Sequence, residues 1–289
     1  MAQTTKKRRR KKRKSTGAVP LLLVLLGLLL VLLLGIRMLF RSGQDLPEET
    51  AASSPSVTLT LPPSVLTAEC FGTVDGFKTY ESDTITGAIG IDVSSHQGYI
   101  DWPAVAASGV DYAIIRAGFR GYSDGGTNED ACFRDNIQGA LDSGLDVGVY
   151  FFSQALDQEE AVAEAQEVLD MVSGYDLRYP IYFDWEPIED PDARTATISA
   201  TELTQCAQAF CSTIEEAGYE AGVYFNLSLA MGLYHLYELK DYDFWLAEYQ
   251  DIPSYPFAID MWQYTNEGTV PGISTDVDLN LSFQETPGT

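Results

Sequence analysis

Beyond residue 41 the sequence has very few basic side chains. Of its 18 lysines and arginines, 11 lie in residues 1–41, whereas all 42 aspartates and glutamates come later in the 289-residue chain. Residues 42–289 therefore carry seven basic and 42 acidic side chains, a formal charge of −35. Such a surface repels phosphate backbones and anionic lipid head groups, so we expect no nucleic-acid partner for this part of the chain.

Histidine and cysteine are also scarce. His96 and His235 are the only histidines, so a Ser-His or Cys-His hydrolase would have to use one of them. No spacing of cysteine and histidine is typical of a zinc site, and we expect neither a metal nor another cofactor. Four cysteines are too few for a disulfide scaffold; Cys70 and Cys132 either pair outside the cell or stay free.

Charge is absent from residues 17–36, GAVPLLLVLLGLLLVLLLGI. About 20 helical residues at roughly 1.5 Å each match a hydrocarbon core of roughly 30 Å, so this segment can cross a bilayer once. We interpret residues 1–16 as a basic cytoplasmic tail and 17–40 as a transmembrane signal anchor in the cell membrane, with the rest of the chain outside. The alternative is a cleaved signal peptide and a secreted protein.

The next segment lacks the periodicity of a folded domain. Residues 41–69 are rich in Ser, Thr, Pro and Glu, which is typical of a flexible tether. Residues 70–87 have no clear pattern and are interpreted as a lead-in. We therefore assign 41–87 to a linker and 88–289 to a folded domain.

From residue 88 onward, short apolar runs alternate with amphipathic stretches. The predicted strands are 88–94, 111–118, 146–153, 180–186, 220–226, 243–249, 258–264 and 275–280. Helices are predicted at 128–144, 157–174 and 199–218. Repeated strand and helix over roughly 200 residues favours an α/β fold of the (β/α) TIM-like barrel type, with an open doubly wound sheet second.

Four acidic residues end predicted strands. In a parallel barrel the working residues lie at the carboxyl ends of the strands, and Asp92, Asp184, Glu186 and Asp278 are placed there. Asp184 and Glu186, in YFDWEP, are two positions apart and so project from the same face of a strand. Like charges held close raise one pKa, which can keep one acid protonated. On spacing alone, solvated strand-end acids remain an equal interpretation.

Aromatic side chains accompany these acids. Tyrosine and tryptophan occur along the predicted strands at 150, 182, 224, 245, 249, 262 and 264. Acidic side chains surrounded by aromatic rings at the mouth of a barrel suit a sugar as ligand. The faces of a sugar ring stack on aromatic rings, and its hydroxyl groups need hydrogen bonds. Any single one of these rings could equally fill the core.

Eight motifs occur in an order that resembles glycoside hydrolase family 25, the lysozyme or N-acetylmuramidase family. They are GIDVSSHQGYIDW, YAIIRAGFRGY, VGVYFFSQA, PIYFDWEP, AGVYFN, FWLAEY, MWQYT and VDLN, spread over residues 88–283. The resemblance implies a modified (β/α) barrel. It also implies cleavage of the β-1,4 bond between N-acetylmuramic acid and N-acetylglucosamine in peptidoglycan.

The motifs imply roles for individual residues. Glu186 would be the general acid, and Asp184 would stay ionised to stabilise positive charge or orient the substrate's N-acetyl group. Asp92 would tune charge and hold substrate. The implied substrate-binding residues are Asp278, Tyr150, Tyr224, Asn226, Glu248, Tyr249, Trp262 and Gln263. Arg116 is expected to pair with carboxylates inside the barrel, and the stereochemical course stays open.

These observations predict a monomeric, membrane-anchored muramidase that acts on peptidoglycan glycan strands. Two alternatives remain. One is a catalytically silent wall-binding module, which loss of the acids would favour although all four are present. The other is a glycosidase for another N-acetylhexosamine polymer such as chitin.

Overall fold

A closed barrel of eight strands forms the centre of the fold. The computed structural model describes residues 60–286, so the predicted basic tail, the transmembrane anchor at 17–40 and the tether as far as residue 59 lie outside the described residues. Within the described range, no helix has the length and apolar character needed to cross a membrane.

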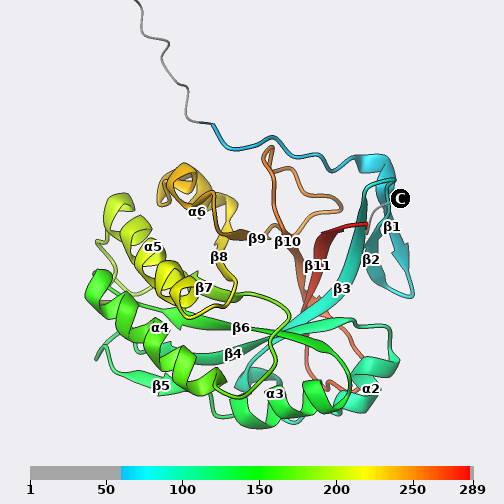
Figure 1. The fold of residues 1–289 in the computed structure, drawn as a ribbon, viewed down its shortest axis with the longest axis horizontal. Helices are drawn as coiled ribbons and strands as arrows, with labels where there is room; N and C mark the ends of the chain where they lie inside the picture. The colour runs from blue at the N-terminus through cyan, green and yellow to red at the C-terminus, as the bar shows by residue number, and fades with distance from the viewer. Residues whose placement is uncertain (1–59, 287–289) are drawn as a thin grey trace, which may run out of the picture. The chain divides into compact units, whose positions relative to one another are not determined.

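The barrel strands follow the predicted ones closely. They are β3 (Ile85–Val93), β4 (Tyr112–Arg120), β6 (Asp146–Ser153), β7 (Ile181–Trp185), β8 (Ala221–Asn226), β9 (Asp243–Ala247), β10 (Met261–Gly268) and β11 (Val277–Glu285). Neighbours are parallel from β3 to β10, and β11 closes the barrel by pairing antiparallel with both β10 and β3. The barrel prediction is therefore confirmed, and the open doubly wound alternative is wrong (Figure 1).

The antiparallel β11 is the main departure from a regular (β/α) barrel. Only residues 269–276 connect β10 to β11, and a parallel crossover needs a dozen or more residues, usually with a helix. Because the connection is short, the last strand returns in the opposite direction.

Helices cover only part of the barrel. The three predicted helices are α3 (Phe133–Asp142), α4 (Gln158–Val172) and α5 (Ala200–Glu216), with two short ones, α2 (Trp102–Ala107) and α6 (Leu227–Gly232). Ser199 and Glu202 begin α5 with reciprocal side-chain to backbone hydrogen bonds, a capping box. Figure 1 shows α3, α4 and α5 along one side of the barrel, where they pack on β4, β6, β7 and β8.

The predicted helix at 128–144 begins later than expected, at residue 133. Residues Thr127–Glu129 instead form the short strand β5, which pairs antiparallel with the end of β4. The β4–β5 hairpin extends the barrel rim beside α4.

The opposite side of the barrel is covered by the lead-in to the domain. Strands β1 (Phe71–Val74) and β2 (Phe77–Tyr80) form a hairpin beside β3 and β11 (Figure 1). Phe71 packs edge-on against Trp262, with ring centroids 5.6 Å apart. Residue Pro63 bridges to Phe257. From residue 60 the expected linker is thus ordered against the barrel, because its hairpin covers strands that no helix covers.

The barrel interior is filled below its mouth. Tyr112, Tyr182 and Trp245 are fully buried there among other apolar side chains. A side chain at Gly90 would meet the Tyr112 ring at 2.1 Å, so the tyrosine fits only because glycine faces it. Because these side chains fill the barrel interior, a ligand that enters at the mouth of the barrel stays at the mouth.

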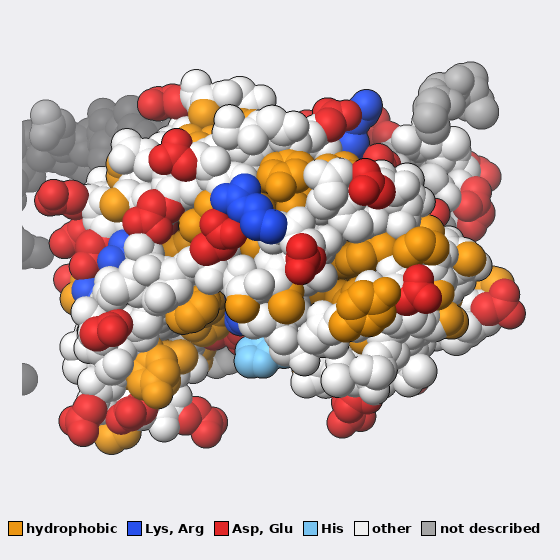
Figure 2. Space-filling model, turned by 90° about the horizontal axis from the view of Figure 1, so that it is seen from below, with side chains coloured by type: hydrophobic (Ala, Val, Ile, Leu, Met, Phe, Trp, Pro, Cys, Tyr) orange, Lys and Arg blue, Asp and Glu red, His pale blue; other side chains and the backbone are white. Residues whose placement is uncertain are grey.

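The cysteines carry no cross-link in the described residues. Cys70 and Cys132 are free thiols, as are the buried Cys206 and Cys211. Figure 2 shows a face on which acidic side chains are widespread and basic ones few, as the charge count predicts.

Candidate active site

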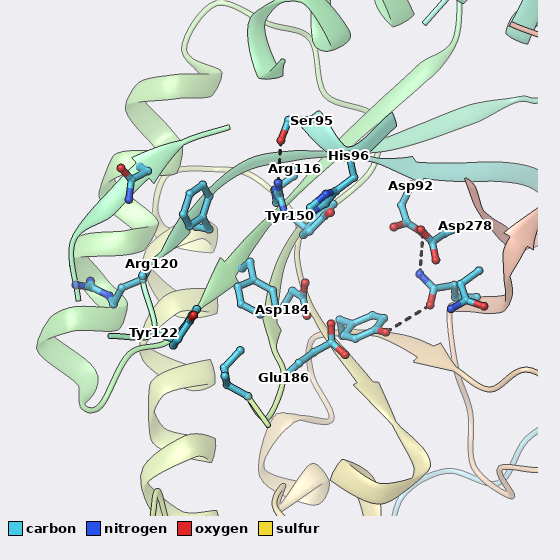
Figure 3. Close-up of a pocket in the computed structure, with 18 of the residues that line it drawn as sticks. Asp92, Ser95, His96, Arg116, Arg120, Tyr122, Tyr150, Asp184, Glu186 and Asp278 are labelled. Atoms are coloured by element: carbon cyan, nitrogen blue, oxygen red, sulfur yellow. Dashed lines mark hydrogen bonds between the residues drawn. The ribbon is translucent and has the colours of Figure 1, made fainter. Parts of the chain in front are cut away.

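A cleft of about 1040 Å³ opens at the carboxyl ends of the barrel strands. Asp92 at the end of β3, Asp184 in β7, Glu186 just after β7 and Asp278 in β11 all line it (Figure 3). Asp92 and Asp278 are directly opposite each other in the β3–β11 pair. The closure of the barrel thus brings together four acids spread over nearly 190 residues of sequence.

Strand alternation places Asp184 and Glu186 as predicted. Within β7, Tyr182 packs inside the barrel on Trp245 at 5.1 Å, while Phe183 packs outside on Phe210 at 5.4 Å. Asp184 lies two residues after Tyr182 and faces inward as Tyr182 does, and Glu186, two residues further on, also lines the cleft. The alternation therefore aims both carboxyl groups at the same space.

The carboxyl groups titrate abnormally. Burial raises the pKa of Asp184 well above its usual value, and the charges of Glu186 and Asp92 raise it further. Burial also raises the pKa of Glu186, with Asp278 adding to the effect. The pKa of Asp278 is raised by burial to about 6. Burial and mutual repulsion therefore favour the protonated forms of these carboxyl groups over four negative charges in one cleft.

This result changes the predicted division of labour. The sequence suggested that Asp184 stays ionised beside a protonated Glu186, yet Asp184 is only 6% exposed and its pKa rises as well. Among the described residues, its Oδ1 atom has no hydrogen-bond partner. Burial without a hydrogen-bond donor disfavours the ionised form of this carboxyl group.

Asp92 is held by a chain of hydrogen bonds. Its Oδ2 atom accepts from Gln263 Nε2 and from Asn280 Nδ2, both at 2.8 Å. The Tyr249 hydroxyl donates to Gln263 Oε1 at 2.9 Å, and Trp245 Nε1 donates to Asn280 Oδ1 at 2.8 Å. Each amide has its orientation fixed by a neighbour, so the Asp92 carboxyl has one position. Burial and Asp278 raise the pKa of Asp92, although the two amides oppose this.

Arg116 is the cation nearest to the acid cluster. Its Nε atom donates to Asp130 Oδ2 at 2.7 Å and its NH2 atom to Ser95 Oγ at 3.1 Å. Burial opposes ionisation of Asp130, but hydrogen bonds from backbone N–H groups and Arg116 lower its pKa. The expectation that Arg116 pairs with a carboxylate is confirmed. The sequence missed Asp130 because it was assigned to a helix.

Four of the other predicted substrate-binding residues line the cleft: Tyr150, Tyr224, Tyr249 and Gln263. Tyr249 is 49% exposed at the rim, whereas Tyr150 and Tyr224 are nearly buried. His96 also lines the cleft, while His235 precedes a short helical turn away from it.

Three predicted residues lie outside the cleft lining. Asn226 caps α6, because its side chain accepts from Leu229 N–H at 3.0 Å. The Glu248 carboxylate accepts the Ser254 N–H at 2.8 Å, and Trp262 is fully buried on the outer face of the barrel. In each of the adjacent pairs 248–249 and 262–263, one residue lines the cleft and the other does not. For 262–263, in β10, the reason is that adjacent strand residues face opposite sides.

The sequence interpretation did not assign a binding role to several residues of the site. Trp245 was predicted only as one of the aromatic residues at the mouth; it lines the cleft and donates to Asn280, which holds Asp92. Phe119, Tyr122 and Phe152 also line the cleft and were not selected.

A barrel whose mouth carries a carboxyl pair between aromatic rings defines a protein of the glycosidase class. The sequence profile of glycosyl hydrolases family 25 matches residues 91–273, which is more than half of the chain, and the protein belongs to this family.

Individual proteins and a solved structure that are similar to this chain agree with the family assignment. The autolytic lysozyme of Clostridium acetobutylicum is 29% identical over 192 residues, covering 66% of this chain and 54% of that protein. Lysozyme M1 of Streptomyces globisporus is 27% identical over 209 residues, covering 68% and 67%. The modular autolysin LytC of Streptococcus pneumoniae, solved with a synthetic peptidoglycan ligand, matches with a TM-score of 0.63 and 26% identity. That match covers 73% of this chain and 51% of LytC. The chain thus spans about half the length of the first and third relatives.

Proposed function

We propose that this protein is a peptidoglycan hydrolase of the N-acetylmuramidase type. It cleaves the β-1,4 bond between N-acetylmuramic acid and N-acetylglucosamine. The observation that carries the proposal is the joint placement of Asp184 and Glu186 in one aromatic-walled cleft at the barrel mouth. The family, and relatives described as lysozymes, support the same reaction.

In this proposal Glu186 is the general acid. Burial and Asp278 raise its pKa, which favours the protonated form that a general acid needs. The proton passes to the glycosidic oxygen as the bond from that oxygen to the anomeric carbon breaks. Water then supplies a hydroxyl group to the anomeric carbon, and its remaining proton returns to Glu186, which restores the starting state.

Asp184 acts on the sugar that develops positive charge. Asp184 lines the cleft, and in this proposal its carboxylate accepts the N–H group of the substrate's 2-acetamido group. That hydrogen bond favours the ionised carboxylate and orients the acetamido oxygen toward the anomeric carbon. A substrate-assisted course of this kind is an analogy with other D-x-E glycosidases.

The linkage is tested by the products of digestion. Purified peptidoglycan treated with the protein is expected to yield fragments with reducing N-acetylmuramic acid. Reducing N-acetylglucosamine would contradict the muramidase assignment. Faster cleavage of N-acetylglucosamine oligosaccharides than of peptidoglycan would favour the chitin-type alternative, and binding of walls without any cleavage would favour the silent module.

We also propose that residues 17–40 anchor the enzyme in the cell membrane, with the catalytic domain outside. The support is the uncharged run behind a basic block, and the −35 formal charge of residues 42–289. An acidic enzyme gains no attraction from anionic walls, so an anchor would keep it near its substrate. The full chain should sediment with membranes and be released by detergent but not by high salt. Leu28→Arg combined with Leu29→Arg should move it out of the membrane fraction, whereas Leu28→Ile combined with Leu29→Ile should not. Salt release of the unaltered protein would contradict the anchor.

A further inference from the structure

The backbone of Glu186 lies just beyond the strand ladders that hold the rest of β7. The last pair between β6 and β7 joins Ser153 to Trp185. The last pair between β7 and β8 joins Asp184 to Tyr224, so Glu186 comes after both ladders have ended. A group that transfers a proton to one particular oxygen needs a fixed position, because a displacement of about 1 Å can cost about 100-fold in rate. Contacts outside the ladders must therefore hold this residue.

The side chain of Gln154 supplies a contact that the ladder no longer provides. Gln154 directly follows the last residue of β6 and is fully buried. Its Nε2 atom donates to the backbone carbonyl of Glu186 at 3.0 Å, which adds one hydrogen bond beyond the end of the β6–β7 ladder. Gln154 is not among the residues that line the cleft. It would therefore act on a substrate only through Glu186.

Thr195 fixes the direction in which the Gln154 amide is turned. The hydroxyl group of Thr195, which is also buried, donates to Gln154 Oε1. A carbonyl oxygen can only accept a hydrogen bond, so the NH₂ end of the amide must face Glu186 and its oxygen must face Thr195. Both ends of the amide have a partner, and the side chain therefore has one orientation.

Arg194 ties the same loop to β6, to α4 and to the turn after β4. Its NH1 atom donates to Gln154 O at 3.0 Å, and its backbone N–H donates to Tyr122 O at 2.9 Å. Its NH2 atom pairs with Glu160 of α4 at 2.6 Å. The loop after β7 is thus fastened at its start and again near its end, and Gln154 takes part in the bonds at both places.

We propose that Gln154 is a positioning residue for the general acid. This inference rests on the proposed function and adds a residue to it. By holding the carbonyl group of Glu186, Gln154 fixes the backbone from which the acid reaches the glycosidic oxygen. The amide is uncharged and buried away from the sugar. Its loss should therefore slow proton transfer and leave substrate affinity unchanged.

Gln154→Met removes the donor and keeps an unbranched side chain of similar length. We expect kcat on purified peptidoglycan to fall about 10- to 100-fold, with KM within about twofold of the unaltered protein. Thr195→Val keeps the shape of threonine but leaves the amide without its second partner, and should lower kcat about fivefold. Thr195→Ser keeps the hydroxyl group and should stay within about twofold.

Gln208→Met is the matched control. Gln208 Nε2 also donates to a backbone carbonyl, that of Glu238 at 3.1 Å, but it lies on α5 and does not line the cleft. The same substitution there removes the same kind of bond and should leave kcat unchanged.

Combining Gln154→Met with Glu186→Gln tests whether Gln154 acts through the acid. Once residue 186 has no proton to transfer, its exact position matters little, so Gln154→Met should change the residual kcat by less than about twofold. A further loss of about tenfold in the double variant would show a general structural role and overturn the inference. An unchanged kcat in Gln154→Met alone would also overturn it.

Hydrogen exchange separates this inference from the reaction itself. The backbone N–H groups of Ala193, Arg194 and Ala196 are hydrogen-bonded and report on the loop after β7. In the full chain, Gln154→Met should speed their exchange, whereas Gln208→Met should not. Unchanged exchange in Gln154→Met would overturn the inference even if the protein cleaves peptidoglycan. No cleavage by the unaltered protein, together with faster exchange in Gln154→Met, would overturn the proposed function while Gln154 still held the backbone of residue 186.

Discussion

Glu186→Gln is expected to lower kcat on purified peptidoglycan by about 10²–10⁴-fold. The amide keeps the shape of the side chain but has no proton to transfer, so the leaving oxygen must depart as an anion. Glu186 lines the cleft, and Gln154 Nε2 donates to its backbone carbonyl, a bond that the substitution keeps. The variant should therefore melt at nearly the same temperature as the unaltered protein. Turnover is measured by the release of reducing ends.

Glu189→Gln is the matched control for this change. Glu189 lies three residues further along the same loop, is exposed, and does not line the cleft, so the same substitution should leave kcat unchanged. If Glu186→Gln retained more than a tenth of the activity while Glu189→Gln was fully active, Glu186 would not be the general acid.

Asp184→Asn is expected to lower kcat by about 10²–10³-fold. A neutral amide cannot balance the positive charge on the sugar, and its oxygen accepts a hydrogen bond from the acetamido N–H more weakly than a carboxylate does. The alkaline limb of the pH–rate profile should also move to lower pH. Glu186 then lacks a negatively charged neighbour, so its pKa falls and it loses its proton sooner as pH rises.

The pH profile distinguishes this role from a structural one. A variant that only loosened the fold would lower activity at every pH without moving the limb. Asp192→Asn, at an exposed position in the loop after β7, supplies the control and should leave both rate and profile unchanged. An unshifted limb in Asp184→Asn, with normal stability, would show that Asp184 and Glu186 do not share their titration.

The main acids of the site were predictable because they follow from local patterns. Asp184 and Glu186 end a strand that the apolar run at 181–183 defines, and a period of two places them on one face. Asp92 was found in the same way, at the carboxyl end of another strand. Asp278 was predicted at the carboxyl end of a strand too, but it lies at the amino end of β11 and reaches the mouth because β11 runs antiparallel. The carboxyl ends of parallel strands converge in a barrel, so the other three acids could be assigned to one mouth before the fold was known.

The same reasoning could not decide which of two neighbouring residues at a strand end faces the cleft. Gln263 reaches Asp92 in the cleft while Trp262 packs against the β1–β2 hairpin, and nothing local tells the two apart. The answer depends on which side the hairpin covers. The partner of Arg116 was missed for a related reason, since Asp130 reaches it only because β5 pairs with β4 and delays the next helix.

By itself the sequence determined the order of strands and helices, the position of the acids and the charge of the domain, because these depend on residues close together in the chain. The tertiary structure alone decided the antiparallel closure by β11, the raised pKa of Asp184 and the wall of Phe119, Tyr122 and Phe152. Each of these depends on contacts between distant segments, such as Gln263 with Asp92 across 171 residues, and on the burial that such contacts create. Periodicity sets which way a side chain points from its own strand, but only packing sets what it meets there.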